Sequence, residues 1–182
     1  MEPINLIFNG PPGVGKTSLA EYFAEQSING ACIDVDKIRH FQIGGLCINP
    51  NEKSFIDQKR LAYLNTKCLI DNFRKNNIET FVADLVIDPK IINAYQLEMG
   101  NIKNSYHFVL LPDILVAKER NKKRNKWNIM EDDVIEKYYR MIREYSLPDN
   151  WIIIDSSEQK IEETANTIKE ILKSKMTTET EK

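Results

Sequence analysis

The sequence predicts an α/β protein built on a five-stranded parallel sheet with helices on both faces. Short, continuous apolar runs alternate along the chain with longer segments of helical periodicity, which is the order that a parallel sheet covered on both sides requires. A glycine-rich turn follows the first apolar run and precedes the first helical segment. The length of 182 residues suits one compact domain with a continuous core.

The expected elements follow this alternation along the whole chain. The five expected strands are residues 4–8, 31–35, 80–83, 106–111 and 151–154. Helices are expected from Thr17 to about residue 29, over 54–75, after Asp88-Pro89, after Pro112-Asp113, over 131–145 and around 161–172. The helix over 54–75 carries an apolar stripe of Leu61, Leu64, Cys68 and Leu69. We expect one domain over residues 1–174 and a polar, frayed tail over 175–182.

Composition and charge exclude several classes of protein. Hydrophobic residues make up 42% and charged residues 29% of the chain, and no apolar run approaches the roughly 18 residues of a membrane span. Three cysteines without a CxxC pair argue against a disulfide framework or a zinc ribbon. The net charge of −2 gives no general attraction to nucleic acid. The first apolar run is too short for a secretory signal and has no basic flank, so we expect a cytoplasmic protein.

The glycine-rich turn satisfies the phosphate-binding motif G-x-x-x-x-G-K-[ST] and stands between a predicted strand and a predicted helix. Its residues, with the serine that follows, are Gly10, Pro11, Pro12, Gly13, Val14, Gly15, Lys16, Thr17 and Ser18. Backbone N–H groups of such a loop surround phosphate oxygens, while Lys16 reaches the β- and γ-phosphates and Thr17 offers its hydroxyl to Mg²⁺. A glycine-rich turn without function would explain the glycines but not Lys16 and Thr17 in register. The sequence therefore predicts a protein that binds a nucleoside triphosphate.

Two other classes of phosphate-loop protein fit the sequence less well. Guanine-specific GTPases usually carry N-K-x-D, whereas residues 125–128 read N-K-W-N, and residues 84–87 read D-L-V-I without the glycine of D-x-x-G. The chain is also short for an AAA+ module with its added helical domain. We therefore expect neither a GTPase nor a remodelling motor.

Two carboxylates and an arginine follow the second predicted strand, at the edge of an open α/β sheet where ligands bind. Asp34, Asp36 and Arg39 form a D-x-D-x-x-R pattern. Alternation along a strand would turn both carboxylates to one side, with the arginine about one helical turn further on. One carboxylate would take the proton of an acceptor hydroxyl, and Arg39 would bind an anion on the acceptor or the transferring phosphoryl group. Alternatively, Asp36 caps a helix and Arg39 makes a surface ion pair.

A third carboxylate, Asp84, ends the apolar run 80–83 and has the form of a Walker B element. Such a carboxylate holds Mg²⁺ directly or through water. Many buried strands also end at a polar turn, which is the alternative interpretation. We expect Thr17, Asp34 and Asp84 to be the metal-binding residues.

A basic segment over residues 118–126 has six basic residues against one acidic residue. Arg120 and Arg124 are four residues apart and would share one face of a helix. The segment suits a lid over a triphosphate, a solvated helix or a contact with nucleic acid.

The phosphate loop, the D-x-D-x-x-R element and the basic segment together resemble the small P-loop kinases, among them chloramphenicol phosphotransferase, adenylylsulfate kinase, polynucleotide kinase and shikimate kinase. The resemblance implies the P-loop NTPase fold with a small basic lid at about residues 118–130. It also implies that Asp36 is similar in role to a general base, and that Arg120 and Arg124 contact phosphates when the lid closes. Adenylylsulfate kinases carry D-G-D-N-x-R, whereas residues 34–39 read D-V-D-K-I-R, so specificity for adenylylsulfate is not expected.

These observations predict an ATP- and Mg²⁺-dependent phosphotransferase that moves the γ-phosphoryl group to a hydroxyl of a small molecule. The residues expected to act in the reaction are Lys16, Asp36, Arg39, Arg120 and Arg124. Two alternatives stay open: a nucleotide-gated binding protein whose ATP turnover is incidental, and a kinase acting on a polynucleotide end. The expected partner is a small-molecule acceptor rather than a membrane, and the sequence specifies neither the acceptor nor the oligomeric state.

Overall fold

The computed structural model describes residues 2–126 and 129–180, and it confirms the predicted parallel sheet. The strands are β1 (Asn5–Asn9), β2 (Gly30–Asp34), β3 (Glu79–Ala83), β4 (Ser105–Leu110) and β5 (Trp151–Ile154). They lie in the order β2-β3-β1-β4-β5, and each neighbouring pair of these strands is parallel. The chain therefore fills one side of β1 with β2 and β3 and then the other with β4 and β5. Such a change of side opens a ligand crevice at the carboxyl ends of the strands.

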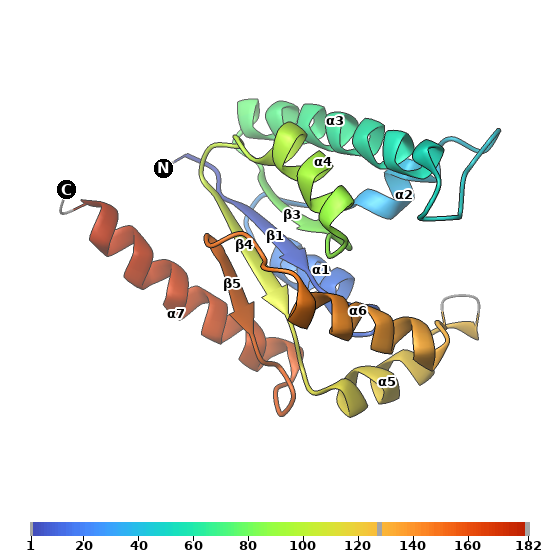
Figure 1. Cartoon of the computed structure of the whole chain (residues 1–182). Helices are drawn as coiled ribbons and strands as arrows, with labels where there is room; N and C mark the ends of the chain where they lie inside the picture. The colour runs from blue at the N-terminus through green and yellow to red at the C-terminus, as the bar shows by residue number, and fades with distance from the viewer. Residues whose placement is uncertain (1, 127–128, 181–182) are drawn as a thin grey trace.

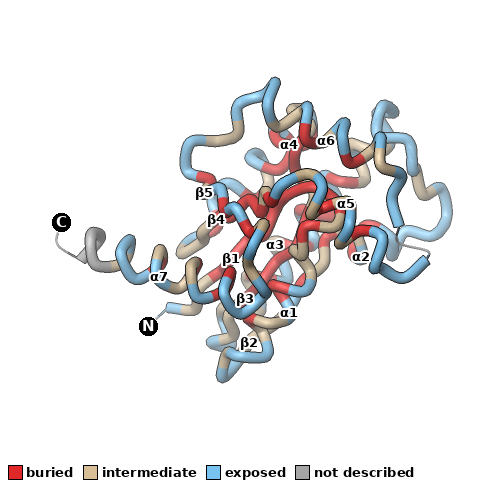
Figure 2. The backbone as a smooth tube through the Cα atoms, turned by 90° about the horizontal axis from the view of Figure 1, so that it is seen from below, coloured by how far each residue is buried: buried red, intermediate tan, exposed pale blue. Residues whose placement is uncertain are grey.

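Helices cover both faces of this sheet, as Figure 1 shows. The helices α2 (Val35–Arg39), α3 (Lys53–Lys75) and α4 (Pro89–Met99) pack on one face. The other face is covered by α1 (Lys16–Gln26), α5 (Ile114–Lys122), α6 (Asp132–Glu144) and α7 (Ile161–Thr180). Each face of the sheet has its own hydrophobic core, and successive residues of β1 point to opposite faces. Leu6 and Phe8 pack in the core on the α1 side, and Ile7 packs in the core on the α3 side. The buried residues accordingly concentrate along the sheet in Figure 2.

Two helix starts that the sequence predicts are confirmed, and both have an aspartate as N-cap. Asp88 accepts a hydrogen bond from the backbone N–H of Lys90 at 2.9 Å, with Pro89 in the first turn of α4. Asp113 accepts one from the N–H of Leu115 at 2.8 Å at the start of α5. In each case the side chain satisfies a donor that the first helical turn would otherwise leave unpaired.

The apolar stripe of α3 is exposed, although such a stripe generally marks the buried face of a helix. Leu61 is 50% exposed, and Leu64, Cys68 and Leu69 also face solvent. The buried face instead contains Lys59, Ala62, Tyr63, Thr66 and Ile70. The core face of α3 therefore combines a lysine and a threonine with the apolar packing of Ala62, Tyr63 and Ile70.

Several element boundaries differ from the sequence-based expectation, among them the end of α1, which lies at Gln26 instead of at about residue 29. The second strand ends at Asp34, and the next residues form α2 instead of extending the strand. The helix α7 continues to Thr180, beyond residue 174 where the sequence places the end of the domain. Across the described part of the chain, no helix combines the length and apolar character of a membrane span.

Candidate active site

The phosphate-binding motif forms the turn between β1 and α1, as its position in the sequence predicts. Positive φ values of 138° at Gly10 and 83° at Gly13 place both residues in conformations that favour glycine. A Cβ on Gly10 would lie 2.3 Å from the carbonyl oxygen of Leu110, and a Cβ on Gly13 would lie 2.7 Å from that of Ala117. The loop therefore packs directly against β4 and α5, and only glycine fits at these two positions.

A buried asparagine, Asn9, fixes the start of this loop. Its Oδ1 accepts hydrogen bonds from the N–H groups of Gly10 and Val86, both at 2.7 Å, and its Nδ2 donates to the carbonyl of Val86 at 2.6 Å. These bonds tie the phosphate loop to the segment that follows β3. The sequence analysis missed Asn9 because its partner Val86 lies 77 residues away.

Lys16 begins α1, and its ammonium group donates a hydrogen bond to the Pro11 carbonyl at 2.8 Å. Loss of hydration lowers the pKa of Lys16 to about 8, an effect that the Asp36 carboxylate opposes and the Arg124 guanidinium strengthens. The ammonium is still charged at pH 7. Its position matches that of the motif lysine that contacts phosphates.

A cleft of about 990 Å³ runs past the phosphate loop, across the carboxyl ends of the strands. We call its two ends the α7 end, lined by residues that include Arg120 and Gln159, and the α2 end, lined by residues that include Asp34, Asp36 and His40. The volume lies at the upper limit of the roughly 300–1,000 Å³ that small-molecule sites occupy. The cleft therefore has room for ligands on both sides of the phosphate loop.

The two carboxylates after β2 have different environments. Asp34 caps α2, because its Oδ1 accepts hydrogen bonds from the N–H groups of Asp36 at 3.1 Å and Lys37 at 3.3 Å. Asp36 lies in the first turn of α2. Strand alternation therefore does not place Asp36, which lies in a helix, and the alternative that Asp36 is the helix cap is wrong. Capping engages Oδ1 of Asp34, and the carboxylates of Asp34 and Asp36 both line the cleft.

A buried lysine of α3, Lys59, links Asp36 to Asp84. Its Nζ lies 3.0 Å from Oδ1 of Asp36 and 2.6 Å from Oδ1 of Asp84. Burial alone would lower the pKa of Lys59, but the two carboxylates raise it above its ordinary value. Burial raises the pKa of Asp36, whereas Lys59, Arg39 and Lys16 lower it, and the net result is a pKa below the usual range. The sequence analysis missed Lys59, because no local pattern distinguishes a buried lysine within a long helix.

Asp84 follows β3, and its side chain is fully buried. Its Oδ1 pairs with Lys59, while its Oδ2 has no hydrogen-bond partner among the described residues. A buried oxygen without a partner suits a bound cation or an ordered water. Thr17 and Asp34 line the same cleft. The described residues contain no group of three or more acidic, histidine or cysteine side chains placed to hold a metal, so Mg²⁺ would take its other ligands from phosphate and water.

Arg39 is buried, so the alternative that it makes a surface ion pair is wrong. One terminal nitrogen donates to the Cys47 carbonyl at 2.9 Å, and the other lies 3.0 Å from Nε2 of His40. The guanidinium also lies over the Phe55 ring, 4.8 Å from its centroid, and its Nε is 3.7 Å from Asp36. These contacts support the segment after α2, and a role of Arg39 in binding an anion stays a prediction.

The two arginines of the basic segment occupy different positions. Arg120, on α5, donates to the carbonyls of Ser156 at 2.7 Å and Gln159 at 3.1 Å. Arg124 lies two residues beyond the end of α5, so the expectation that both arginines share one helical face is wrong. Both still line the cleft. Residues 127 and 128 of the predicted lid lie outside the described residues.

The chain matches no protein-family model, and no curated protein matches it in sequence. Its fold does match solved structures. A thymidylate kinase from Candida albicans has a TM-score of 0.69 at 12% identity, over 96% of this chain and 93% of its own. A shikimate kinase from Bacteroides thetaiotaomicron has a TM-score of 0.63 at 16% identity, over 93% of this chain and 98% of its own. A gluconokinase from Sinorhizobium meliloti has a TM-score of 0.58 at 15% identity, over 91% of this chain and 89% of its own. The predicted α/β P-loop NTPase fold, in the form found in small P-loop kinases, is thereby confirmed.

Proposed function

We propose that the protein is an ATP- and Mg²⁺-dependent phosphotransferase that moves the γ-phosphoryl group of ATP to a hydroxyl group of a small molecule. The observation that carries this proposal is the placement of Asp36. Its carboxylate faces the cleft that contains Lys16 and is held by the buried Lys59 at 3.0 Å. A fixed carboxylate beside a phosphate loop gives the site a proton acceptor, which a protein that only binds nucleotide does not need.

The reaction divides between the two ends of the cleft. The acceptor oxygen attacks the γ-phosphorus, the bond from that phosphorus to the bridging oxygen breaks, and ADP leaves with the electron pair. Asp36 accepts the proton that the hydroxyl loses. Lys59 keeps the Asp36 carboxylate oriented towards the α2 end, where the acceptor would bind.

The triphosphate is the ligand of the phosphate loop. Backbone N–H groups of the loop and the amino end of α1 would surround its oxygens, and Lys16 would contact the β- and γ-phosphates. Arg124, whose charge acts on Lys16, would approach the same phosphates from the basic segment. The adenosine would then extend towards the α7 end, beside Arg120 and Gln159.

Mg²⁺ would be held by the Thr17 hydroxyl together with Asp84 and Asp34, the latter two directly or through water. When bound, the ion neutralises charge on the phosphate oxygens. The unpartnered Oδ2 of Asp84 is the observation that supports this donor set.

One experiment separates this function from the two alternatives: ADP release measured with a panel of nucleosides, sugars, antibiotics and oligonucleotides. A small-molecule kinase shows release above the acceptor-free rate with one of the small-molecule groups, and Asp36→Asn abolishes that increase. Stimulation by oligonucleotides alone, with a steep dependence on salt, would identify a polynucleotide kinase. A slow rate that no compound changes would identify a nucleotide-gated binding protein.

A further inference from the structure

His40 ends the short helix α2 at the α2 end of the cleft, four residues after Asp36. Its backbone N–H donates to the carbonyl of Asp36 at 2.9 Å, so the helical turn continues from one residue to the other. Side chains four residues apart on a helix lie on the same face, with their Cβ atoms about 5–6 Å apart. Both residues also line the cleft. The turn therefore places an imidazole ring beside the carboxylate that the proposed reaction uses as its proton acceptor.

The buried guanidinium of Arg39 contacts both of these side chains. One terminal nitrogen lies 3.0 Å from Nε2 of His40, and its Nε lies 3.7 Å from Oδ1 of Asp36. The other terminal nitrogen donates to the Cys47 carbonyl at 2.9 Å, and the centroid of the Phe55 ring lies 4.8 Å from the guanidinium carbon. Figure 1 shows α2 beside the amino-terminal part of α3, the helix that carries Phe55. A fixed cation thus sets the relative positions of the imidazole and the carboxylate.

The contact with Arg39 determines which ring nitrogen of His40 carries the hydrogen. A guanidinium has only N–H donors, so Nε2 of His40 accepts the hydrogen bond and cannot itself carry a hydrogen. The ring is then a neutral imidazole with its hydrogen on Nδ1. Nδ1 has no partner among the residues that the structure describes. His40 therefore offers one N–H donor at the cleft.

Asp36 and His40 form a pair of opposite hydrogen-bonding character. The Asp36 carboxylate only accepts, and in the proposed reaction it takes the hydrogen of the reacting hydroxyl group. The Nδ1–H of His40 only donates, so its partner must be an atom with a lone pair. Two oxygens on adjacent carbons of one compound can contact both side chains at once, one as donor and the other as acceptor. A compound with a single oxygen leaves the His40 donor unpaired when the cleft is filled, which costs affinity.

We infer that His40 binds the acceptor, and that the acceptor is a vicinal diol, in which the carbon next to the reacting hydroxyl group carries a second oxygen. This inference rests on the proposed phosphotransferase function. The reacting hydroxyl donates to Asp36, and the neighbouring oxygen accepts from Nδ1–H of His40. The inference concerns the arrangement of oxygens and not the charge of the acceptor, because Lys37 also lines this end of the cleft, and Lys16 and Arg124 line the same cleft.

The test uses three pairs of compounds, each added to the full chain with ATP and Mg²⁺. The members of a pair differ by one oxygen next to a hydroxyl group: glycerol and propane-1,3-diol, D-glucose and 2-deoxy-D-glucose, adenosine and 2′-deoxyadenosine. We expect saturable stimulation of ADP release by the first member of at least one pair, with a kcat/KM about tenfold or more above that of its partner. Equal or reversed values in every pair, or no saturable stimulation by any of these compounds, overturns the inference.

Two variants of His40 locate the effect within the responding pair. His40→Phe keeps an aromatic ring but removes the N–H, so it should lower kcat/KM for the diol to about the value for its partner. His40→Gln keeps an oxygen for Arg39 and an N–H for the acceptor, and it should restore part of the difference. If His40→Phe instead lowers kcat/KM for both members by the same factor, His40 acts only by supporting Arg39, and the inference is overturned.

Lys37→Met is the matched control, because Lys37 is another donor at the same end of the cleft. It should keep the difference within the pair. Loss of the difference in Lys37→Met, with His40→Phe unaffected, would assign the contact to Lys37 and overturn the inference. Stimulation only by compounds without a vicinal diol would also overturn it, while leaving the proposed function intact. Failure of the parent chain to bind a nonhydrolysable ATP analogue would instead refute the proposed function itself.

Discussion

The phosphate-loop part and the α2 end of one cleft are built in opposite ways. The phosphate loop is a single run of residues, and its geometry follows from glycines at fixed spacing and a helix that begins at Lys16. The α2 end instead brings together Asp36, Lys59 and Asp84 from α2, α3 and the segment after β3, and the contact between Lys59 and Asp84 spans 25 residues. A local motif can be recognised in a sequence, whereas a site assembled by packing depends on the folded chain.

The largest loss of stability should come from substitution of Lys59, which links Asp36 to Asp84 at the α2 end. Lys59→Met removes the cation that Asp84 faces in the core, and breaking a buried pair in this way costs about 3–5 kcal/mol of unfolding free energy. The double variant Lys59→Met with Asp84→Asn removes both charges and should recover much of that loss. Urea unfolding of the three proteins measures both effects.

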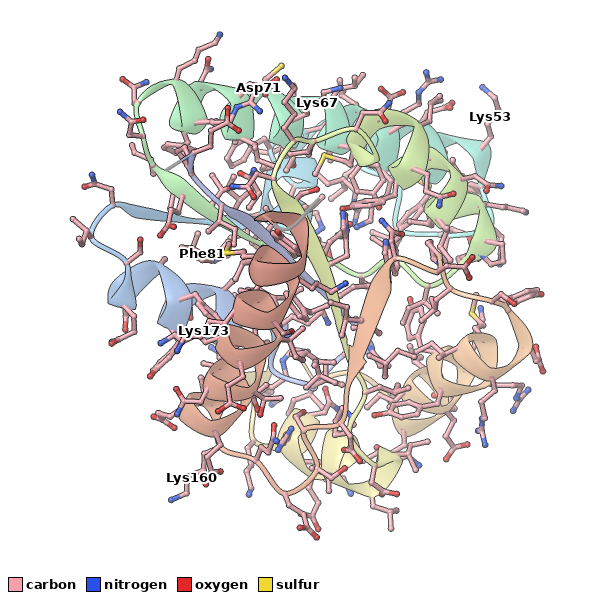
Figure 3. The ribbon with its side chains drawn as sticks, turned by 90° about the vertical axis from the view of Figure 1, so that its left-hand side faces the viewer. Lys53, Lys67, Asp71, Phe81, Lys160 and Lys173 are labelled. Atoms are coloured by element: carbon pink, nitrogen blue, oxygen red, sulfur yellow. The ribbon has the colours of Figure 1, made fainter. Side chains whose placement is uncertain are left out.

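Lys53→Met is the matched control for this comparison. Lys53 lies on the same helix and also pairs with a carboxylate, but its side chain is 90% exposed and extends from the surface in Figure 3. An exposed pair contributes little to stability. Equal destabilisation by the Lys53 and Lys59 variants would show that the buried pair has no special role.

Substitution in the phosphate loop should have a different result: it should lower the activity of the protein without lowering its stability. Lys16→Ala removes a contact to the transferring oxygens and should lower turnover roughly a hundredfold or more. Its pKa of about 8 means that burial opposes the charged form, so the thermal midpoint at pH 7 should not fall. A variant with turnover close to that of the parent chain would remove Lys16 from the reaction.

A smaller effect on stability is expected from His107, which lies in the core, remote from both ends of the cleft. Burial lowers the pKa of His107 from 6.5 to about 4, and Tyr95 and Trp151 enclose its ring. Between these two values the unfolded chain binds a proton that the folded chain does not, so stability is lost as the pH falls. The expected contribution between pH 7 and pH 5 is about 2 kcal/mol.

His107→Gln should remove this part of the pH dependence, and the exposed His40→Gln should leave it unchanged. Urea unfolding at pH 7, 6 and 5 compares the three proteins. If the free energy of unfolding of the His107 variant falls with pH as steeply as that of the parent chain, other groups cause the acid sensitivity.

The sequence predicted the fold well because its signals are local. Each strand bound lies within one residue of its predicted position, Asp88 caps its helix as expected, and a helix begins after Asp113 as expected. The face of α3 was not predictable, because its apolar stripe lies in solvent while Lys59 lies in the core. The environments of Asp34 and Arg39 also required the structure, since α2 begins where the strand was expected to continue.

The central claim is that Asp36 accepts the proton of the acceptor, and it is tested most directly by comparing Asp36→Asn with Asp34→Asn. Asparagine caps helices about as well as aspartate, so Asp34→Asn should keep its thermal midpoint, and any loss of activity should be recovered partly by added Mg²⁺ or acceptor. Asp36→Asn should lower kcat by about a hundred- to ten-thousandfold at every Mg²⁺ and acceptor concentration, because asparagine cannot take up the proton. An Asp36→Asn enzyme with undiminished kcat would contradict the account.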